Sequence, residues 1–284
     1  MQLLDGKALS KKIKNGVGKE IKELKADKGI VPGLAVLLVG NDPASHVYVG
    51  MKKKACEEVG IYSITHEMPD DISQEAIIDT IKMMNENPNI DGILIQLPLP
   101  PQIDTTQILE AVAPHKDVDG FHPYNVGRLT AGLDGFVPCT PLGVMKLLDE
   151  YNLDVKGMNA VVVGASNIVG KPMASLLLNA GATVDICHIH TKNLKAHTIH
   201  ADILLVGVGK INLITDDMVK DDVIVIDIGI NKTESGKLVG DCDFEAVSKK
   251  SSYITPVPGG VGPMTIAMLL SNTLKAAKKR EPHE

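Results

Sequence analysis

The sequence predicts an α/β fold in two domains, and three observations lead to this prediction. The chain has 284 residues, and at ~100–200 residues per domain this length corresponds to roughly two domains. Short apolar runs alternate with stretches of helical length, which is typical of a parallel sheet flanked by helices. The alternation stops in residues 114–141, which are rich in glycine, proline and polar side chains, and then starts again. We therefore place a domain boundary near Pro138, where two prolines flank a short extended link.

The first half is expected to begin with an amphipathic helix over about 30 residues, because Leu9, Ile13 and Val17 recur at helical spacing. A buried strand follows in the apolar run GLAVLLVG. Pro43 then suits the first position of a helix. The further elements expected are a helix over residues 43–60, a strand over 61–65, a helix over 73–84 and a strand over 91–97.

In the second half, the same rhythm predicts a helix over 142–151, a strand over 160–163, a helix from Asn167, a strand over 182–187, a helix near Lys192 and strands over 201–206 and 222–229. A final helix over 263–279 is expected to pack back on the first domain. The predicted domains are therefore 1–138 together with 264–284, and 139–263.

Composition excludes several classes of protein. The net charge of −6 and the eight aromatic residues argue against a nucleic-acid partner. No apolar run approaches the ~20 residues that span a bilayer, and the N-terminus lacks the apolar stretch of a secretory signal, so we expect no membrane association. The four cysteines are scattered and form no C-x-x-C pair, which indicates reduced thiols in a cytoplasmic protein.

A glycine-bearing turn between a strand and a helix predicts a dinucleotide site in the second half. Backbone N–H groups in such a turn, together with the helix N-terminus, favour a pyrophosphate. The turn departs from G-x-G-x-x-G, because Ser166 stands at the second glycine position and the last glycine comes one residue late. Many α/β proteins carry such a turn for packing only, without binding a nucleotide. The turn here consists of Gly164, Ala165, Ser166, Asn167, Ile168, Val169 and Gly170.

The end of the following strand favours NADP over NAD. An NAD site usually places a carboxylate there, on the ribose 2′-hydroxyl. Here Cys187 is followed by His188, Ile189 and His190, with Lys192 two residues further, and Asp185 lies within the strand pattern. Histidine and lysine suit a 2′-phosphate better than a free hydroxyl, although solvated loop residues would look the same.

The same segment invites a metal interpretation, which we do not adopt. His188, His190, His197 and His200 are close in sequence, and the last two could share a helix face. Apart from Cys187, no cysteine or acidic partner stands at a fitting spacing, so no metal site is predicted.

A candidate chemical site lies in the first half. Ser45, Tyr48 and Lys52 stand at i, i+3 and i+7 and project from one helix face. A partly desolvated lysine can act as an acid or base beside a ring that flanks a planar ligand. From this helix alone, a lysine run is more typical of a solvated helix surface. Gln96 ends a strand, where ligands of parallel sheets bind, although a polar residue there is often only a turn former. Asp117 and Asp119 offer carboxylates in a loop, and because Asp–Gly is a turn signal we expect at least one of them to be structural.

The segment 255–265 holds three glycines and three prolines in eleven residues and leads into the last helix. Such a loop allows close approach of a ligand to the backbone.

Together these segments resemble the bifunctional methylenetetrahydrofolate dehydrogenase/methenyltetrahydrofolate cyclohydrolase family, which carries a Rossmann-type NAD(P)-binding second domain. The resemblance covers essentially the whole chain. It rests on S-x-x-Y-V-x-x-K, DGILIQLPLP, KDVDGFHPYNVGRL, PCTP, VVVGASNIVGKP, VIDIGIN and YITPVPGGVGPMT.

The resemblance implies a role for each candidate residue. Lys52 would be the acid/base of the cyclohydrolase step, Tyr48 would pack on the folate, Gln96 would set the protonation state of the lysine, and Asp119 would anchor the pterin. The other residues expected to contact or support the substrate are Ser45, Leu97, Pro98, Pro258, Gly259, Gly260, Gly262, Pro263 and Thr265. The residues expected around the cofactor are Gly164, Ala165, Ser166, Ile168, Val169, Gly170, His188, Ile189 and, near the nicotinamide, Ile230.

The implied function is NADP-dependent oxidation of 5,10-methylenetetrahydrofolate, followed by hydrolysis of the methenyl product to 10-formyltetrahydrofolate. Both steps are expected at one site in a cleft between the domains, in a homodimer formed through the second domain. NAD stays the alternative cofactor, because Ala165 and Ile189 stand where relatives can carry Arg or Ser toward the 2′-phosphate. Three alternatives stay open: an NADP-dependent dehydrogenase of another small acid of the shikimate type, a non-catalytic nucleotide-sensing module, and the loss of one of the two activities.

Overall fold

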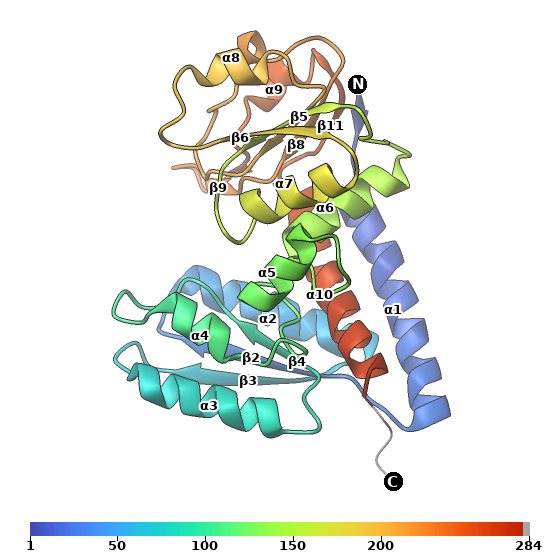
Figure 1. Ribbon diagram of the computed structural model, residues 1–284, viewed down its shortest axis with the longest axis vertical. Coiled ribbons are helices and arrows are strands. Elements are labelled where there is room, and N and C mark those ends of the chain that lie inside the picture. The colour runs from blue at the N-terminus through green and yellow to red at the C-terminus, as the bar shows by residue number, and fades with distance from the viewer. Residues whose placement is uncertain (281–284) are drawn as a thin grey trace. The chain divides into compact units, whose positions relative to one another are not determined.

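The computed structural model describes residues 1–280 and confirms the α/β class, with the chain divided into two compact units (Figure 1). Unit 1 comprises Met1–Lys11, Leu129–Leu133 and Thr140–Thr265. Unit 2 comprises Lys12–Arg128, Asp134–Cys139 and the chain from Ile266 onward. The N-terminal segment thus groups differently from the predicted division. The reason is that β1 (Gln2–Leu3) pairs in parallel with β11 (Ser251–Ile254) and joins the sheet of unit 1.

Unit 2 is built on a three-stranded parallel sheet with the order β3-β2-β4. The central strand β2 (Gly33–Val39) is buried along its whole length, as its continuous apolar sequence predicts. The chain passes from β2 to β3 (Tyr62–Met68) on one side and then crosses to β4 (Gly92–Ile95) on the other. The strand order therefore reverses between β2 and β4, and ligands of open α/β sheets bind at the carboxyl ends of the strands at such a point.

The helices of unit 2 cover this sheet. α2 (Pro43–Val59) follows β2, α3 (Gln74–Glu86) follows β3, and α4 (Thr105–Ala111) follows β4. One core cluster joins α3 and α4 to the sheet; its largest fully buried members are Leu37, Ile77, Ile81, Ile93 and Ile108. α1 (Gly6–Lys28), α5 (Pro123–Thr130) and α10 (Val261–Lys278) complete the helices that contribute residues to this unit.

Unit 1 is built on a six-stranded parallel sheet with the order β1-β11-β8-β7-β5-β6. Its central strands are β5 (Asn159–Val163), β7 (Ile203–Val206) and β8 (Val223–Asp227), and β6 (Thr183–Cys187) lies at the edge. The chain runs from β5 to β6 and then back past β5 to β7. A second reversal of strand order therefore lies between β5 and β7.

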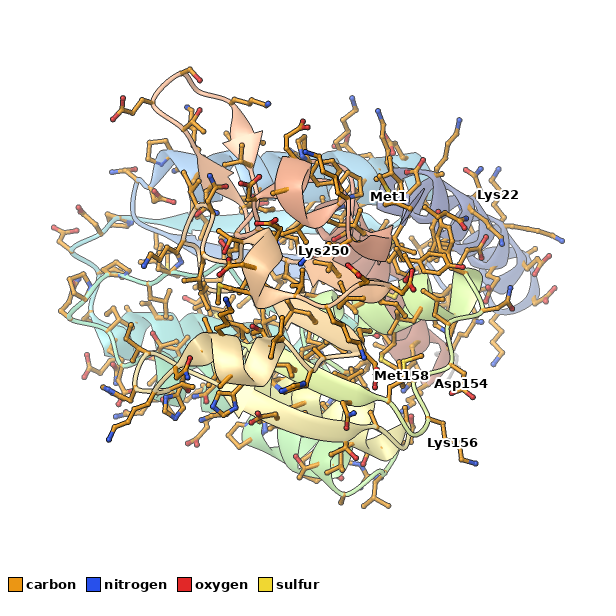
Figure 2. All side chains as sticks on the ribbon, turned by 90° about the horizontal axis from the view of Figure 1, so that it is seen from above. Met1, Lys22, Asp154, Lys156, Met158 and Lys250 are labelled. Atoms are coloured by element: carbon orange, nitrogen blue, oxygen red, sulfur yellow. The ribbon has the colours of Figure 1, made fainter. Side chains whose placement is uncertain are left out.

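Helices lie on both faces of this sheet (Figure 1). α6 (Cys139–Glu150) and α7 (Gly170–Asn179) are on one face, and α8 (Leu194–Thr198) and α9 (Phe244–Val247) are on the other. A short 3-10 helix, η1 (Asp216–Met218), and an antiparallel pair, β9 (Asn231–Lys232) and β10 (Leu238–Val239), complete the unit. In the loop before β5, the exposed side chains of Asp154 and Lys156 project outward (Figure 2).

All the predicted helices and strands are present in the structure, some with shifted bounds. α7 begins at Gly170 rather than Asn167, because residues 167–169 form a turn. The helices α4, α5 and α9 and the strands β1, β9, β10 and β11 were not predicted. Within residues 1–280, no helix is long and apolar enough to cross a membrane.

Candidate functional site

The lysine predicted to carry the chemistry has a defined partner in unit 2. Lys52, on α2, is half-buried, and its Nζ donates a hydrogen bond to Oε1 of Gln96 at 2.9 Å. Gln96 is 8% exposed and directly follows β4, and its Nε2 in turn donates to the carbonyl of Leu97 at 2.7 Å. The pair therefore joins α2, which follows β2, to the end of β4, at the point where the strand order reverses.

The start of α2 fixes the face that carries Lys52. The carboxylate of Asp42 caps the helix, accepting hydrogen bonds from the backbone N–H and the hydroxyl of Ser45, both at 2.8 Å. These bonds lower the pKa of Asp42 and occupy the Ser45 side chain, which is 3% exposed. Ser45 thus supports the helix, whereas Tyr48, one turn further, is 39% exposed and free to meet a ligand.

The loop that carries Asp119 is aligned with the same end of the sheet. A parallel bridge joins Ile93 of β4 to Asp117. Two residues further along each segment, Asp119 comes level with the end of β4, where Gln96 lies. Burial raises the pKa of Asp119, and the charge of Lys52 opposes that shift. The structure therefore places Lys52, Gln96 and Asp119 together.

Asp117 holds this loop in shape rather than facing a ligand. Its carboxylate accepts from the backbone N–H groups of Gly120, Phe121 and His122 at 2.9–3.1 Å and from Asn125 Nδ2 at 2.8 Å. Gly120 has φ +76°, and a Cβ there would lie 2.6 Å from the backbone at residues 137 and 138. A side chain at that position would push the loop away from its support, so the glycine is required by close approach.

Two peptide bonds preceding proline are cis at the segments predicted to contact substrate. One joins Leu97 to Pro98, directly after Gln96, and the other joins Val257 to Pro258. In the segment 258–265 of unit 1, the carbonyl of Gly259 accepts from Lys7 N–H at 2.9 Å. The hydroxyls of Thr265 and Thr140 share a hydrogen bond of 2.9 Å. Folate contact by Pro258, Gly259, Gly260, Gly262, Pro263 and Thr265 stays a prediction.

The glycine turn after β5 is tight and leads into the N-terminus of α7. Gly164 has φ +122°, and a Cβ there would lie 2.5 Å from the carbonyl oxygen of Gly207, at the end of β7. A Cβ at Gly170 would lie 1.9 Å from the carbonyl oxygen of Gly164. The hydroxyl of Ser166 accepts from the N–H of Val169 at 3.1 Å. The two glycines permit a tight turn against the α7 N-terminus at the second reversal of strand order, which fits a dinucleotide phosphate.

The turn after β6 presents polar groups and one apolar side chain to solvent. The backbone N–H of His188 donates to the Thr191 hydroxyl at 2.8 Å, and the rings of His188 and His190 lie 5.8 Å apart in a T-shaped arrangement. Ile189 is 92% exposed. Ile230, the residue predicted near the nicotinamide, lies with its Cδ1 3.4 Å from the position of a Cβ on Gly262. These two segments of unit 1, predicted for cofactor and substrate, are therefore adjacent.

Sequence reasoning missed a buried carboxylate pair at the carboxyl ends of β7 and β8. Asp241 is fully buried and accepts from the N–H groups of Val208, Gly209 and Lys210 at 2.7–3.1 Å and from Asn231 Nδ2 at 2.8 Å. It thereby fixes the loops after both strands.

Its companion Asp227 ends β8 and accepts from the N–H groups of Gly229, Asp241 and Cys242 at 2.9–3.1 Å. Burial raises the pKa of Asp227 to about 6, against these hydrogen bonds. The sequence signal that could have revealed this pair is the two glycines packed against it. A Cβ at Gly229 would lie 2.2 Å from Asp241 Cγ, and one at Gly240 would lie 2.0 Å from Asp227 Oδ2.

Comparison with known proteins gives matches along nearly the whole chain. The family model for the tetrahydrofolate dehydrogenase/cyclohydrolase catalytic domain matches residues 4–119, and the model for the NAD(P)-binding domain of the same family matches residues 138–281. "Bifunctional protein FolD" of Sulfurimonas denitrificans is 76% identical over 278 residues, which are 98% of each chain.

Solved structures agree with these matches. The bifunctional enzyme FolD, a methylenetetrahydrofolate dehydrogenase/cyclohydrolase from Campylobacter jejuni, is 59% identical with a TM-score of 0.98, covering 99% of this chain and 100% of its own. The Trypanosoma brucei methylenetetrahydrofolate dehydrogenase-cyclohydrolase, complexed with NADP and an inhibitor, is 37% identical with a TM-score of 0.93, covering 97% and 96%.

Proposed function

The chain belongs to the tetrahydrofolate dehydrogenase/cyclohydrolase family, and on that premise we propose how its own side chains perform the two reactions. It oxidises 5,10-methylenetetrahydrofolate to the 5,10-methenyl cation with NADP and hydrolyses that cation to 10-formyltetrahydrofolate. Bound NADP accepts the hydride in the first step. The observation that carries our assignment of the second step is the hydrogen bond between Lys52 and Gln96.

In the hydrolytic step, water adds to the carbon between N5 and N10, loses a proton, and the bond from that carbon to N5 breaks as N5 gains a proton. A group that both accepts and returns a proton accelerates this sequence. We assign this role to Lys52, whose Nζ is held by a hydrogen bond to the neutral amide of Gln96. The amide thus orients the Lys52 side chain.

Folate binding is assigned to the surroundings of this pair. Asp119 lies level with the end of β4 and would accept hydrogen bonds from the amino and ring N–H groups of the pterin. Tyr48, exposed one turn before Lys52 on the same helix face, would pack on a ring of the substrate. Leu97 and Pro98 follow Gln96 directly and would border the same ligand.

The dinucleotide is assigned to the turn from Gly164 to Gly170, whose two tight glycines and helix N-terminus suit a pyrophosphate. His188 and Ile189, exposed after β6, would border the adenosine ribose. Ile230, beside Gly262, would border the nicotinamide.

We further propose a homodimer formed through unit 1. Two apolar side chains on adjacent elements support it: Leu178 of α7 is 62% exposed, and Ile186 of the edge strand β6 is 39% exposed. Light scattering of the Leu178→Glu/Ile186→Lys variant is expected to give half the mass of the wild type. All four cysteines are free and buried, which suits the cytoplasm as the proposed location.

The central experiment is an absorbance assay with 5,10-methylenetetrahydrofolate, run with NADP and NAD in parallel. The expected result is faster reduction of NADP, with the methenyl product then consumed by the same enzyme. Reduction of NADP with shikimate and not with the folate would support the small-acid alternative. Dinucleotide binding with no turnover of either substrate would support the sensing module, and methenyl product that accumulates without hydrolysis would mean that the second activity is lost.

A further inference from the structure

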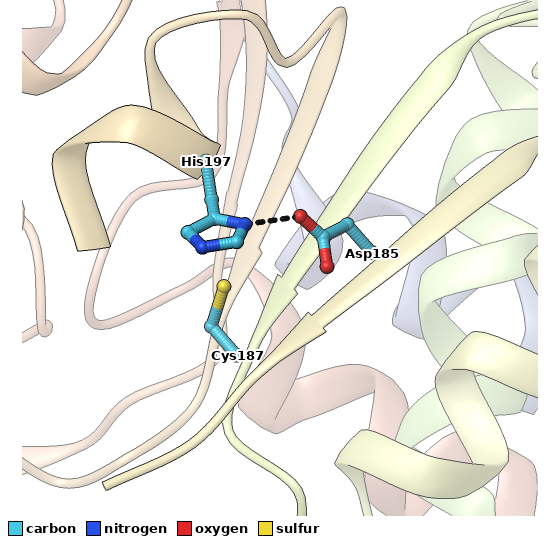
Figure 3. Close-up of side chains that lie close together, drawn as sticks. All are labelled: Asp185, Cys187 and His197. Carbon is cyan, nitrogen blue, oxygen red and sulfur yellow. Dashed lines mark hydrogen bonds and ion pairs between the residues drawn. The ribbon is translucent and has the colours of Figure 1, made fainter. Parts of the chain in front are cut away.

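Three side chains of different chemistry converge on one face of the edge strand β6, outside the machinery described above. Asp185 and Cys187 come from β6 and His197 comes from α8 (Figure 3). One potential ligand atom from each lies within 4.8 Å of the other two. His197 Nδ1 and Asp185 Oδ2 already share a hydrogen bond of 2.5 Å.

The fold explains why these three groups meet. Residues i and i+2 of a strand project to the same side of the sheet, so Asp185 and Cys187 both point toward the face that α8 covers. Leu194, at the start of α8, packs against the core of that face and sets the helix beside β6. This places His197, one turn further along α8, over the two strand residues. The sequence analysis predicted no metal site, because it considered Asp185 only as part of a strand. It therefore did not detect that Asp185, Cys187 and His197 lie together.

We propose that Asp185, Cys187 and His197 form a binding site for a divalent transition-metal ion of borderline character, such as Zn²⁺ or Co²⁺. One sulfur, one nitrogen and one oxygen donor suit these ions, whereas Mg²⁺ and Ca²⁺ prefer oxygen donors alone. Three protein ligands leave a fourth tetrahedral position for water or another small ligand. The thiol of Cys187 loses its proton on binding, so affinity rises with pH.

The geometry needs only small adjustments. A tetrahedral ion with bonds of ~2.0–2.3 Å holds its ligand atoms roughly 3.3–3.7 Å apart. The hydrogen-bonded pair, at 2.5 Å, would open by about 1 Å, and any pair near 4.8 Å would close by a similar amount. Asp185 and His197 keep 50% and 36% of their side chains exposed, so an ion can enter from solvent, while the sulfur lies at the buried floor.

The test is a titration of the full-length, untagged chain with Co²⁺, without dinucleotide. The expected result is a thiolate-to-cobalt charge-transfer band with one equivalent bound, which Zn²⁺ abolishes on addition. Such a band reports a sulfur ligand directly and is independent of enzyme activity. His197→Gln, which keeps a polar side chain of similar length, is expected to weaken binding by at least the roughly 10–100-fold that follows loss of an outer-shell partner. Cys187→Ser is expected to remove the band.

Two matched variants serve as controls. His200→Gln changes an exposed histidine that follows α8, and Cys56→Ser changes a buried cysteine of unit 2. Both are expected to keep the band, and circular dichroism verifies that all four variants are folded. The proposal is wrong if the wild type gives no such band, or if the band survives in folded His197→Gln with unchanged affinity.

Discussion

The ammonium Nζ of Lys52 and the amide Oε1 of Gln96 are joined by a hydrogen bond of 2.9 Å, between a helix that follows β2 and the end of β4. A lysine paired with a carboxylate would be held in its charged form. A lysine paired with an amide is oriented by a hydrogen bond that brings no opposite charge. Burial raises the pKa of the nearby Asp119 carboxyl, and the positive charge of Lys52 lowers it. The hydrogen bond therefore fixes the position of the nitrogen to which we assign proton transfer.

Replacing Lys52 with methionine is expected to abolish most of the cyclohydrolase activity. Methionine retains the apolar length of the side chain but cannot transfer a proton, and general acid–base groups contribute ~10²–10⁴-fold to the rate. The measurement is the decay of methenyltetrahydrofolate absorbance. NADP binding, followed by fluorescence, should stay close to that of the wild type.

Lys82→Met provides the matched control, because Lys82 is an exposed lysine of α3 that pairs with Asp79. That variant is expected to hydrolyse the methenyl compound at the wild-type rate. Undiminished ring opening in Lys52→Met would refute the assignment of Lys52.

Replacing Gln96 with glutamate tests whether the neutral amide matters. A carboxylate in the same place would stabilise the ammonium of Lys52, so the hydrolysis rate should fall at neutral pH and recover partly at higher pH. Gln96→Leu should instead lower the rate without moving the pH profile, since it removes orientation but adds no charge. The readout is the pH dependence of kcat for both variants. Identical profiles for glutamate and wild type would contradict the positioning role.

The sequence indicated candidate side chains for the chemistry more clearly than it indicated how they meet. Lys52 and Tyr48 share a helix face by spacing alone, and Gln96 could be placed at a strand end. That β4 lies beside β2, and so brings Gln96 to Lys52, depends on strand order, which local patterns do not encode. The role of Asp117 as the brace of the Asp119 loop also became visible only through its hydrogen bonds.

The elements missed by sequence reasoning are short or lack a period. β1 has two residues and β11 has four, too few for an alternating pattern. The buried carboxylates Asp227 and Asp241 are 14 residues apart, separated by the β9–β10 pair, so their proximity arises from the return of the chain. The cluster of Asp185, Cys187 and His197 was missed because the alternation along β6 does not reveal that α8 packs over that strand.

The stability of the protein is expected to depend on Asp227 in mildly acidic solution. Its pKa of about 6 in the fold lies above its ordinary value of 3.8, so the protonated form is favoured by folding. That contribution is fully present below about pH 3.8 and is lost as pH rises through about 6. Compared with Asp227→Asn, the wild type should lose up to about 3 kcal/mol of unfolding free energy between pH 4 and 7.

Urea denaturation of both proteins across this range measures the difference. Asparagine keeps the shape but cannot ionise, so other carboxylates cancel in the comparison. A gap that stays constant from pH 4 to 7 would show that Asp227 does not titrate in this window.

Replacing Asp241 with asparagine is expected to weaken NADP binding while leaving folate binding intact. The carboxylate accepts three backbone N–H groups of residues 208–210, and an amide nitrogen in its place would confront one of these donors with another donor. Residues 208–210 follow β7, and the carboxyl ends of the strands border a dinucleotide in this type of fold. Disorder of this loop should therefore raise the Kd for NADP roughly tenfold, which corresponds to about 1.4 kcal/mol. Calorimetric titration with NADP and with a folate analogue separates the two effects. Asp221→Asn, an exposed aspartate of the same unit, should bind NADP as the wild type does. If a folded Asp241→Asn variant bound NADP with unchanged affinity, the carboxylate would stabilise the fold alone and not the cofactor site.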